Sequence, residues 1–157
     1  MFSEVSLKAV AVRIAGLLSE SARSANITLH IRRNMDDLPC TLMNENDLEQ
    51  LFFALIENAI QAADGKKSRQ LVISGAVKDK YIELQLSDDC GGIPAENIGK
   101  IFEPFFTTKP RGQGTGLGLC IVKDIVSRIG GQVRVESKFG KGTTIIINIP
   151  VEKDKIS

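Results

Sequence analysis

The chain has few residues that could tie it together covalently or around a metal ion. Its three cysteines, Cys40, Cys90 and Cys120, are too few and too widely spaced for a disulfide framework or a zinc site. An odd number of cysteines suits a reducing compartment. The fold must therefore depend on an apolar core, and at 157 residues we expect one domain over residues 1–157.

The sequence also lacks long hydrophobic runs and an excess charge of either sign. No apolar run approaches the roughly 18 residues that a membrane span needs, and residues 1–4 do not resemble an export signal. Twenty basic residues against 19 acidic ones give a formal charge of +1, which does not favour nucleic acid or an anionic membrane. We expect a cytoplasmic domain that reaches a membrane only through a longer parent protein.

Hydrophobic periodicity predicts a two-layer α/β sandwich, in which about three helices cover one face of a mixed or antiparallel sheet of about five strands. The helices are expected within 5–24, 46–63 and 117–129, with Ser6 as one N-cap and Asn46 with Glu49 as a capping box. Residues 1–4 and 152–157 are expected to fray. The strands are expected at 27–31, 71–77, 81–87, 132–136 and 143–149, with a short extended piece at 40–43.

Two glycine-rich stretches carry the strongest signals for ligand binding. Gly112 to Gly118 runs directly into the predicted third helix, where free backbone N–H groups and the helix dipole attract phosphate. This stretch is neither a dinucleotide fingerprint nor a P-loop. The earlier stretch, Asp88 to Ile93, follows a predicted strand, so the Asp88 carboxylate could accept the amino group of adenine; an ordinary Asp-Gly turn is the alternative.

The predicted second helix separates polar from apolar side chains. Gln50, Ala54, Glu57, Asn58 and Gln61 share one face, which is either a solvated surface or the wall of a pocket. In the second case Asn58 offers an oxygen to Mg²⁺, and Glu57 could orient a water or hydroxyl.

The segment between Pro94 and Arg111 combines aromatic and basic residues with prolines. Its phenylalanines either pack in the core or border a ligand, and Lys109 and Arg111 either neutralise phosphate or remain solvated. Prolines and glycines flank the segment on both sides, which is typical of a mobile lid.

In their order and spacing, these segments resemble the catalytic ATP-binding domain of bacterial sensor histidine kinases, in the GHKL superfamily of gyrase-like and chaperone ATPases. Residues 46–63 resemble the asparagine box, 88–93 the first glycine box, 101–109 the phenylalanine box and 112–119 the second glycine box. Residues 130–144 fit the C-terminal hairpin of the family. The Phe-Phe-Thr-Thr-Lys form is similar to that of nitrogen-regulation-type kinases.

The resemblance implies a Bergerat-type fold with ATP and Mg²⁺ as cofactors. It makes Asn58 the Mg²⁺ ligand, Asp88 the reader of adenine, Gly92 a position of close approach, and Glu57 and Lys109 the catalytic side chains. The family's lid corresponds to residues 107–113. The further nucleotide contacts implied are Ile93, Phe106, Thr107, Lys109, Gly114, Thr115, Gly116, Leu117 and Gly118.

By the same resemblance, the γ-phosphate passes to a histidine on a separate dimerisation domain, in the parent chain or in trans, and then to a response regulator. The sole histidine, His30, lies in a predicted strand and is not that acceptor, so the fragment alone is not expected to autophosphorylate. Two alternatives stay open: a GHKL ATPase that drives a conformational cycle, and a weakly catalytic nucleotide-sensing or docking module.

Three positions depart from the family pattern. Ala54 replaces a common Asn or Glu, which removes a polar group beside the metal and argues against fast hydrolysis. Cys90 replaces the first glycine of its box, so its side chain is expected either to crowd the nucleotide or to require a different backbone. Gln61 stands where relatives often carry a basic residue, which leaves phosphate neutralisation to Lys109, Arg111 and backbone amides.

Overall fold

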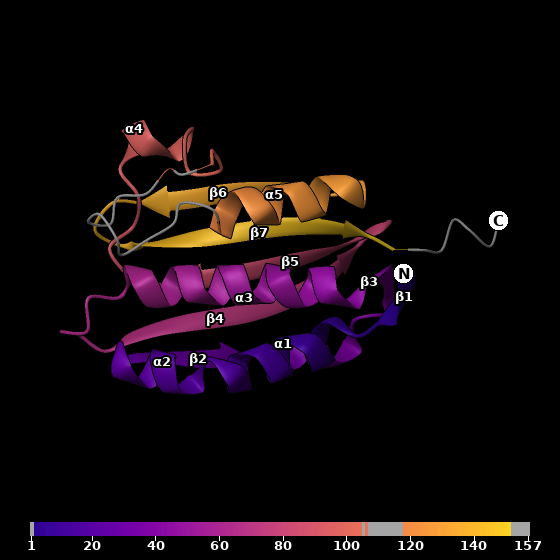
Figure 1. Cartoon of the computed structure of the whole chain (residues 1–157), viewed down its shortest axis with the longest axis horizontal. Helices are drawn as coiled ribbons and strands as arrows, with labels where there is room; N and C mark the ends of the chain where they lie inside the picture. The colour runs from indigo at the N-terminus through magenta and orange to yellow at the C-terminus, as the bar shows by residue number, and fades with distance from the viewer. Residues whose placement is uncertain (1, 105, 107–117, 152–157) are drawn as a thin grey trace.

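The computed structural model describes residues 2–104, 106 and 118–151. In the main sheet, the order of strands is β2-β4-β5-β7-β6, and Figure 1 shows α1, α3 and α5 lying over one face of it. β2 runs parallel to β4, whereas the other neighbours are antiparallel. The predicted mixed five-stranded sheet backed by three helices is thus confirmed. The main strands are β2 (Ile27–Ile31), β4 (Arg69–Lys78), β5 (Tyr81–Asp88), β6 (Gln132–Lys138) and β7 (Gly142–Pro150), and the main helices are α1 (Leu7–Leu17), α3 (Glu45–Ala62) and α5 (Gly118–Arg128).

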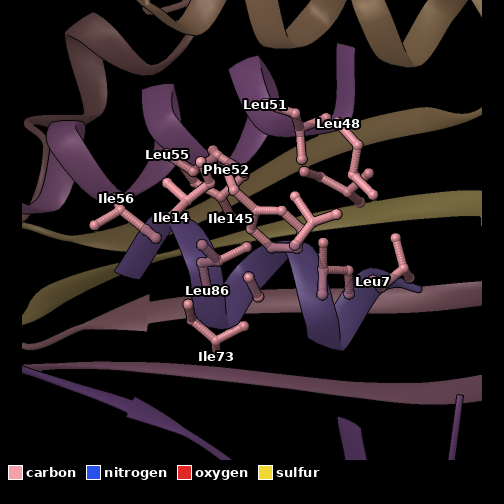
Figure 2. Close-up of a cluster of buried hydrophobic side chains, with 14 of the residues drawn as sticks. Leu7, Ile14, Leu48, Leu51, Phe52, Leu55, Ile56, Ile73, Leu86 and Ile145 are labelled. Carbon is pink, nitrogen blue, oxygen red and sulfur yellow. The ribbon is translucent and has the colours of Figure 1, made fainter. Parts of the chain in front are cut away.

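One apolar core fills the space between the sheet and the helices. It forms because alternate strand residues and one stripe of each helix point into the same layer. Phe52 of α3 is at its centre and is fully buried. Figure 2 shows side chains from both layers that meet in this core. They include Leu7, Ile14, Leu48, Leu51, Leu55, Ile56, Ile73, Leu86 and Ile145.

The N-terminal region differs from its prediction in two ways. The single predicted helix is broken at Leu18 into α1 and α2 (Ser19–Ser24), and the Ser19 hydroxyl donates to the Gly16 carbonyl at 2.9 Å, a bond that competes with helix continuation. Residues 2–4, expected to fray, and Val5, expected in the helix, instead form β1 (Phe2–Val5), which pairs antiparallel with β3 (Thr41–Asn44). Between β2 and β3 the chain forms a 3₁₀ helix, Arg33–Asp37.

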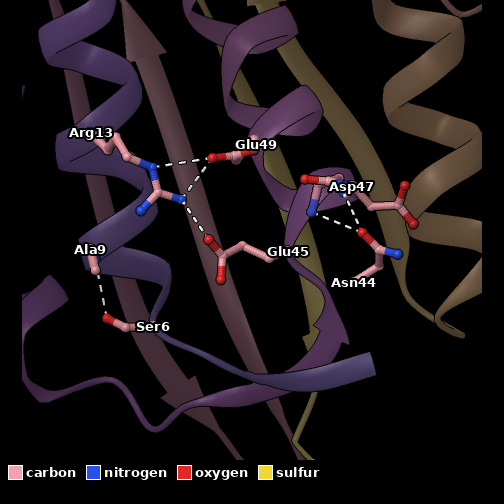
Figure 3. Close-up of polar contacts among 8 residues, drawn as sticks. Ser6, Ala9, Arg13, Asn44, Glu45, Asp47 and Glu49 are labelled. Atoms are coloured by element: carbon pink, nitrogen blue, oxygen red, sulfur yellow. Dashed lines mark hydrogen bonds and ion pairs between the residues drawn. The ribbon is translucent and has the colours of Figure 1, made fainter. Parts of the chain in front are cut away.

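The first turn of α3 is capped by Asn44 and not by the predicted Asn46. The Asn44 Oδ1 atom accepts the backbone N–H groups of Asn46 at 2.8 Å and Asp47 at 3.2 Å (Figure 3). Glu49, the predicted partner in a capping box, instead accepts hydrogen bonds from Arg13 of α1 at 2.8 and 3.1 Å. The N-cap of α3 therefore lies two residues earlier than expected, and Glu49 connects α3 to α1.

We expect Asn44→Ala to lower the free energy of unfolding by about 1 kcal/mol, because two N–H groups of the helix lose their acceptor. Urea denaturation followed by circular dichroism measures this change. Asn46→Ala is the matched control, since its exposed side chain caps nothing, and it should stay within about 0.5 kcal/mol of the parent. An equal loss in both variants would contradict the assignment of the cap.

No helix among the described residues is both long enough and apolar enough to cross a membrane.

Candidate functional site

Four segments meet at one end of the molecule, on the left in Figure 1. They are the C-terminal end of α3, the end of β5, the turn between β6 and β7, and the start of α5. β1 and the end of β7 lie near the opposite end of the sheet (Figure 1). The asparagine box, the first glycine box and the beginning of α5 are therefore brought together by the fold, as the resemblance implies.

Asp88 is the last residue of β5 and lies on the face of the sheet that the helices cover. It follows the buried Leu84 and Leu86 at the two-residue period of a strand, and it is itself half-buried. Burial raises the pKa of the Asp88 carboxyl, although hydrogen bonds from the backbones of Cys90 and Thr143 oppose the shift. The Cys90 N–H donates to Asp88 Oδ1 at 3.0 Å. This bond orients the carboxylate.

Asp89, although adjacent, serves a different purpose. Its exposed carboxylate accepts the backbone N–H of Gln70 at 2.8 Å, and its carbonyl accepts a hydrogen bond from Arg69 at 2.8 Å. Both contacts fasten the loop to the start of β4. Asp88 is therefore the better candidate of the two for binding a ligand.

Cys90 points into the core and not toward an open cleft. Its side chain is 1% exposed, and the thiol lies 3.8 Å from the Ala59 carbonyl of α3. Burial, with the nearby carboxylates of Asp88 and Asp89, raises the pKa of Cys90 to about 12, so the thiol stays protonated. The Cys90 side chain thus packs against α3 and holds the loop there.

Gly92 is required by the protein's own hairpin. Its φ is +74°, and a Cβ atom there would lie 2.2 Å from the Lys138 carbonyl oxygen at the end of β6. Any side chain would thus need both an unfavourable backbone conformation and a shift of the hairpin. The predicted close approach of Gly92 to a nucleotide stays a prediction, and the contact described here is with the Lys138 backbone.

On α3, Asn58 and Ala54 occupy the side that faces α5. Because successive helical residues turn by about 100°, Asn58 lies on the same side as Asp47, whose carboxylate pairs with Arg128 of α5 at 3.1 Å. A Cβ at Gly118, the first residue of α5, would lie 3.9 Å from the Ala54 methyl. Glu57 points about 100° away from Asn58, toward the outside of the helix layer, and is half-buried.

The phenylalanine segment follows the short helix α4 (Ala95–Ile98) and contacts α5. Ile101 is buried, and the Lys123 ammonium of α5 lies 6.0 Å from the centroid of the Phe102 ring, at the outer limit of a cation–π contact. Phe106 is half-buried, and its N–H donates to the Glu103 carbonyl at 3.3 Å.

Several predicted contacts lie outside the described residues, so they stay predictions. They are Thr107, Lys109, Gly114, Thr115, Gly116 and Leu117, and with them the lid and most of the phosphate-binding stretch. Gly118 is the one member of that stretch within the described part of the chain.

Sequence reasoning assigned no role to Ser137 or Thr143, which the structure places beside the predicted site. Strand register aligns Asp88 of β5 with Thr143 of β7, and Thr143 with Ser137 of β6. The only available signal was the Glu136-Ser137 to Thr143-Thr144 pattern of the predicted C-terminal hairpin, which pointed to a fold element and not to a function.

The polar groups at this end of the molecule suit a purine nucleotide better than a metal ion held by protein side chains alone. Asp88 presents a half-buried carboxylate that can accept the amino group of adenine. Within residues 2–104, 106 and 118–151, no three or more His, Cys, Asp or Glu side chains are grouped to hold a metal ion. Asn58 fits the usual mode of Mg²⁺ binding in such sites, in which few protein ligands are supplemented by phosphate oxygens.

Comparison with known proteins agrees with this arrangement. Residues 43–153 match the family described as histidine kinase-, DNA gyrase B-, and HSP90-like ATPase. The match covers most of the chain and includes the asparagine box, both glycine boxes and the hairpin. The chain therefore belongs to this ATPase family.

Its relatives are sensor kinases. The chain is 36% identical to sensor histidine kinase ZraS of Escherichia coli (strain K12) over 86% of its own length and 28% of that protein. It is 33% identical to sporulation kinase E of Bacillus subtilis (strain 168) over 88% of its length and 18% of that protein. The chain thus spans less than a third of either relative.

A solved structure covers nearly the same extent as this chain. The nucleotide-free catalytic domain of histidine kinase ThkA superposes with a TM-score of 0.79 at 28% identity, covering 96% of this chain and 97% of that domain. The fold is therefore that of histidine kinase catalytic domains.

Proposed function

We propose that this chain binds ATP·Mg²⁺ between α3, the loop after β5 and the start of α5, and that it donates the γ-phosphate to a histidine. That histidine belongs to a separate dimerisation domain, in the parent protein or in trans, and a response regulator receives the phosphate next. His30 does not suit this role, because it lies on the edge strand β2 and not on a helix.

One observation carries the proposal: the second half of α3 contacts both halves of the predicted site. The Ala59 carbonyl meets Cys90 of the adenine-side loop, while Ala54 lies against Gly118 at the start of α5. Ala54 and Ala59 are separated by only about 8 Å of rise along α3. Asn58 lies between them, so a single nucleotide can reach Asp88 with its base and α5 with its phosphates.

Each candidate residue has a role that suits its position. Asp88 accepts the amino group of adenine, and Asn58 supplies an oxygen to Mg²⁺. The N-terminus of α5, beginning at Gly118, favours the negative charge of the phosphates. Bound Mg²⁺ neutralises charge on the phosphates, and the protein contributes by holding them in position. We keep Glu57 and Lys109 as the candidate catalytic side chains, with Glu57 orienting the attacking group.

Titration of ATP with and without Mg²⁺ tests the binding step. We expect Mg²⁺ to strengthen ATP binding severalfold, and Asn58→Ala to remove most of that gain while leaving metal-free ADP binding within about twofold. Isothermal titration calorimetry measures both. Gln61→Ala, one turn further on the same helix and exposed, is the control and should retain the Mg²⁺ dependence. A wild-type domain that binds no adenine nucleotide would refute the proposal.

Transfer is tested by adding a purified histidine-bearing dimerisation domain of a sensor kinase with radiolabelled ATP. Acid-labile label on that domain is expected from a kinase. Steady release of inorganic phosphate without any such domain would instead identify a conformational ATPase, and binding without transfer or release would identify a sensing module.

A further inference from the structure

Ser137 joins three segments at the adenine end of the site. Its Oγ atom accepts the Ile93 N–H at 2.7 Å, lies 3.0 Å from the Gly142 carbonyl, and lies 2.7 Å from the Thr143 hydroxyl. Ile93 ends the loop that starts at Asp88, whereas Gly142 and Thr143 begin β7. A single hydroxyl thus links this loop to the β6–β7 hairpin.

These contacts use the full hydrogen-bonding capacity of the serine. A hydroxyl donates one hydrogen bond and accepts two. Ser137 donates to the Gly142 carbonyl, which can only accept, and can accept from the Ile93 N–H and from the Thr143 hydroxyl. All three groups are in a partly buried environment, so each lost bond leaves a polar group poorly solvated.

The same hairpin contacts the loop through backbone atoms at three other points. Gly140 N–H donates to the Gly91 carbonyl at 2.6 Å, and Gly92 lies directly against the Lys138 carbonyl. A Cβ at Gly142 would lie 2.2 Å from the Asp88 carbonyl oxygen. Backbone packing therefore brings the loop and the hairpin together, while the Ser137 hydroxyl fixes the position of the loop at Ile93.

We propose that Ser137 is a positioning residue for adenine recognition: by holding Ile93 and Thr143, it sets the loop conformation in which the Asp88 carboxylate meets the base. Asp88, Thr143 and Ser137 form one row across β5, β7 and β6. The Asp88 carboxylate accepts hydrogen bonds from the backbones of Cys90 and Thr143, so a shift of the loop or of Thr143 would change how the carboxylate is oriented. This inference rests on the proposed nucleotide binding and adds a determinant of its base specificity.

The test compares ADP and GDP binding to the 157-residue chain by calorimetry. Ser137→Ala is expected to weaken ADP binding by about fivefold to thirtyfold, the equivalent of one or two lost hydrogen bonds. GDP binding should change less, so the preference for ADP over GDP falls. Ser137→Cys keeps the side-chain volume with a weaker hydrogen-bonding atom and should give an intermediate loss.

Thr144→Val is the matched control. Thr144 follows Thr143 in β7, so its side chain lies on the opposite face of the sheet, where its hydroxyl bonds to the Ser87 hydroxyl of β5 at 2.8 Å. Its ADP affinity and its ADP preference should stay within about twofold of the parent. In addition, the Ile93 amide resonance should move in Ser137→Ala and not in Thr144→Val.

The outcomes separate this inference from the proposed function. Unchanged ADP affinity or unchanged ADP preference in both Ser137 variants would overturn the positioning role alone. An equal loss in Thr144→Val would also overturn it, since the effect would then be a general weakening of the hairpin. If the unsubstituted 157-residue chain bound neither nucleotide, the proposed function and this inference would both be overturned.

Discussion

Asp88→Asn is expected to weaken adenine nucleotide binding by about 1–3 kcal/mol, since the charged acceptor of the amino group is lost. The unliganded domain should not lose stability. The asparagine Oδ1 can still accept the Cys90 N–H, and burial no longer penalises a charge at this position. The variant thus separates function from folding.

The raised pKa of Asp88 has consequences of opposite sign for stability and binding. Because the folded-state pKa lies above the unfolded one, this group contributes stability that is present below the unfolded pKa and lost as pH rises through the folded pKa. In the proposed function, the ionised Asp88 carboxylate accepts the amino group of adenine. Nucleotide binding should therefore weaken on acidification at a higher pH than an ordinary aspartate would cause, and Asp88→Asn should remove that dependence.

Calorimetric titration of ADP between pH 5 and pH 8, with thermal unfolding of the free protein, measures both effects. Asp89→Asn is the matched control, because Asp89 is adjacent but uses its carboxylate on the Gln70 N–H. It should bind ADP within about twofold of the parent and lose some stability. If both variants bound ADP as tightly as the parent, the assignment of Asp88 would be wrong.

Gly92→Ala is expected to destabilise the domain by about 2–4 kcal/mol, the largest effect that we expect on folding. Alanine at φ +74° is strained, and its Cβ would lie 2.2 Å from the Lys138 carbonyl oxygen. The clash is with backbone, so no side-chain rotation can relieve it. Nucleotide affinity should fall as well, because the displaced loop carries Asp88.

Urea denaturation of Gly92→Ala and Gly91→Ala side by side measures this effect. Gly91 is the matched control, since a Cβ there meets no atom within 4 Å. That variant should stay within about 1 kcal/mol of the parent. Equal stability of the two variants would show that the loop can move away from the hairpin at little cost.

The fold was predictable where local pattern and tertiary packing agree. The two-residue period of β4 and β5 and the apolar stripe of α3 led to the correct layers. The errors lie where side chains decide the ends of helices. The Ser19 hydroxyl and the Asn44 side chain each form a hydrogen bond with a nearby backbone group at a helix end. Where two polar residues stand near the same helix end, as Asn44 and Asn46 do, the sequence does not decide which one caps the helix. β1 was missed because its partner is some 40 residues away in sequence.

The candidate site was predictable only in part, for a related reason. Asp88 and Asn58 stand out by residue type and position within a strand or helix. Ser137 does not, because its importance depends on the register of β6 against β7 and on the path of a loop 44 residues earlier. The packing of Gly92 against the Lys138 carbonyl was likewise not predictable, because it is visible only in three dimensions.

The burial of Cys90 has a chemical consequence for the domain. Oxidants and electrophiles react with the thiolate, and a thiol with a pKa near 12 that is 1% exposed offers almost none. The cysteine beside Asp88 is thus shielded from oxidation for as long as the loop stays docked on α3. A residue type that is reactive at exposed positions stands here in a place where its reactivity is suppressed.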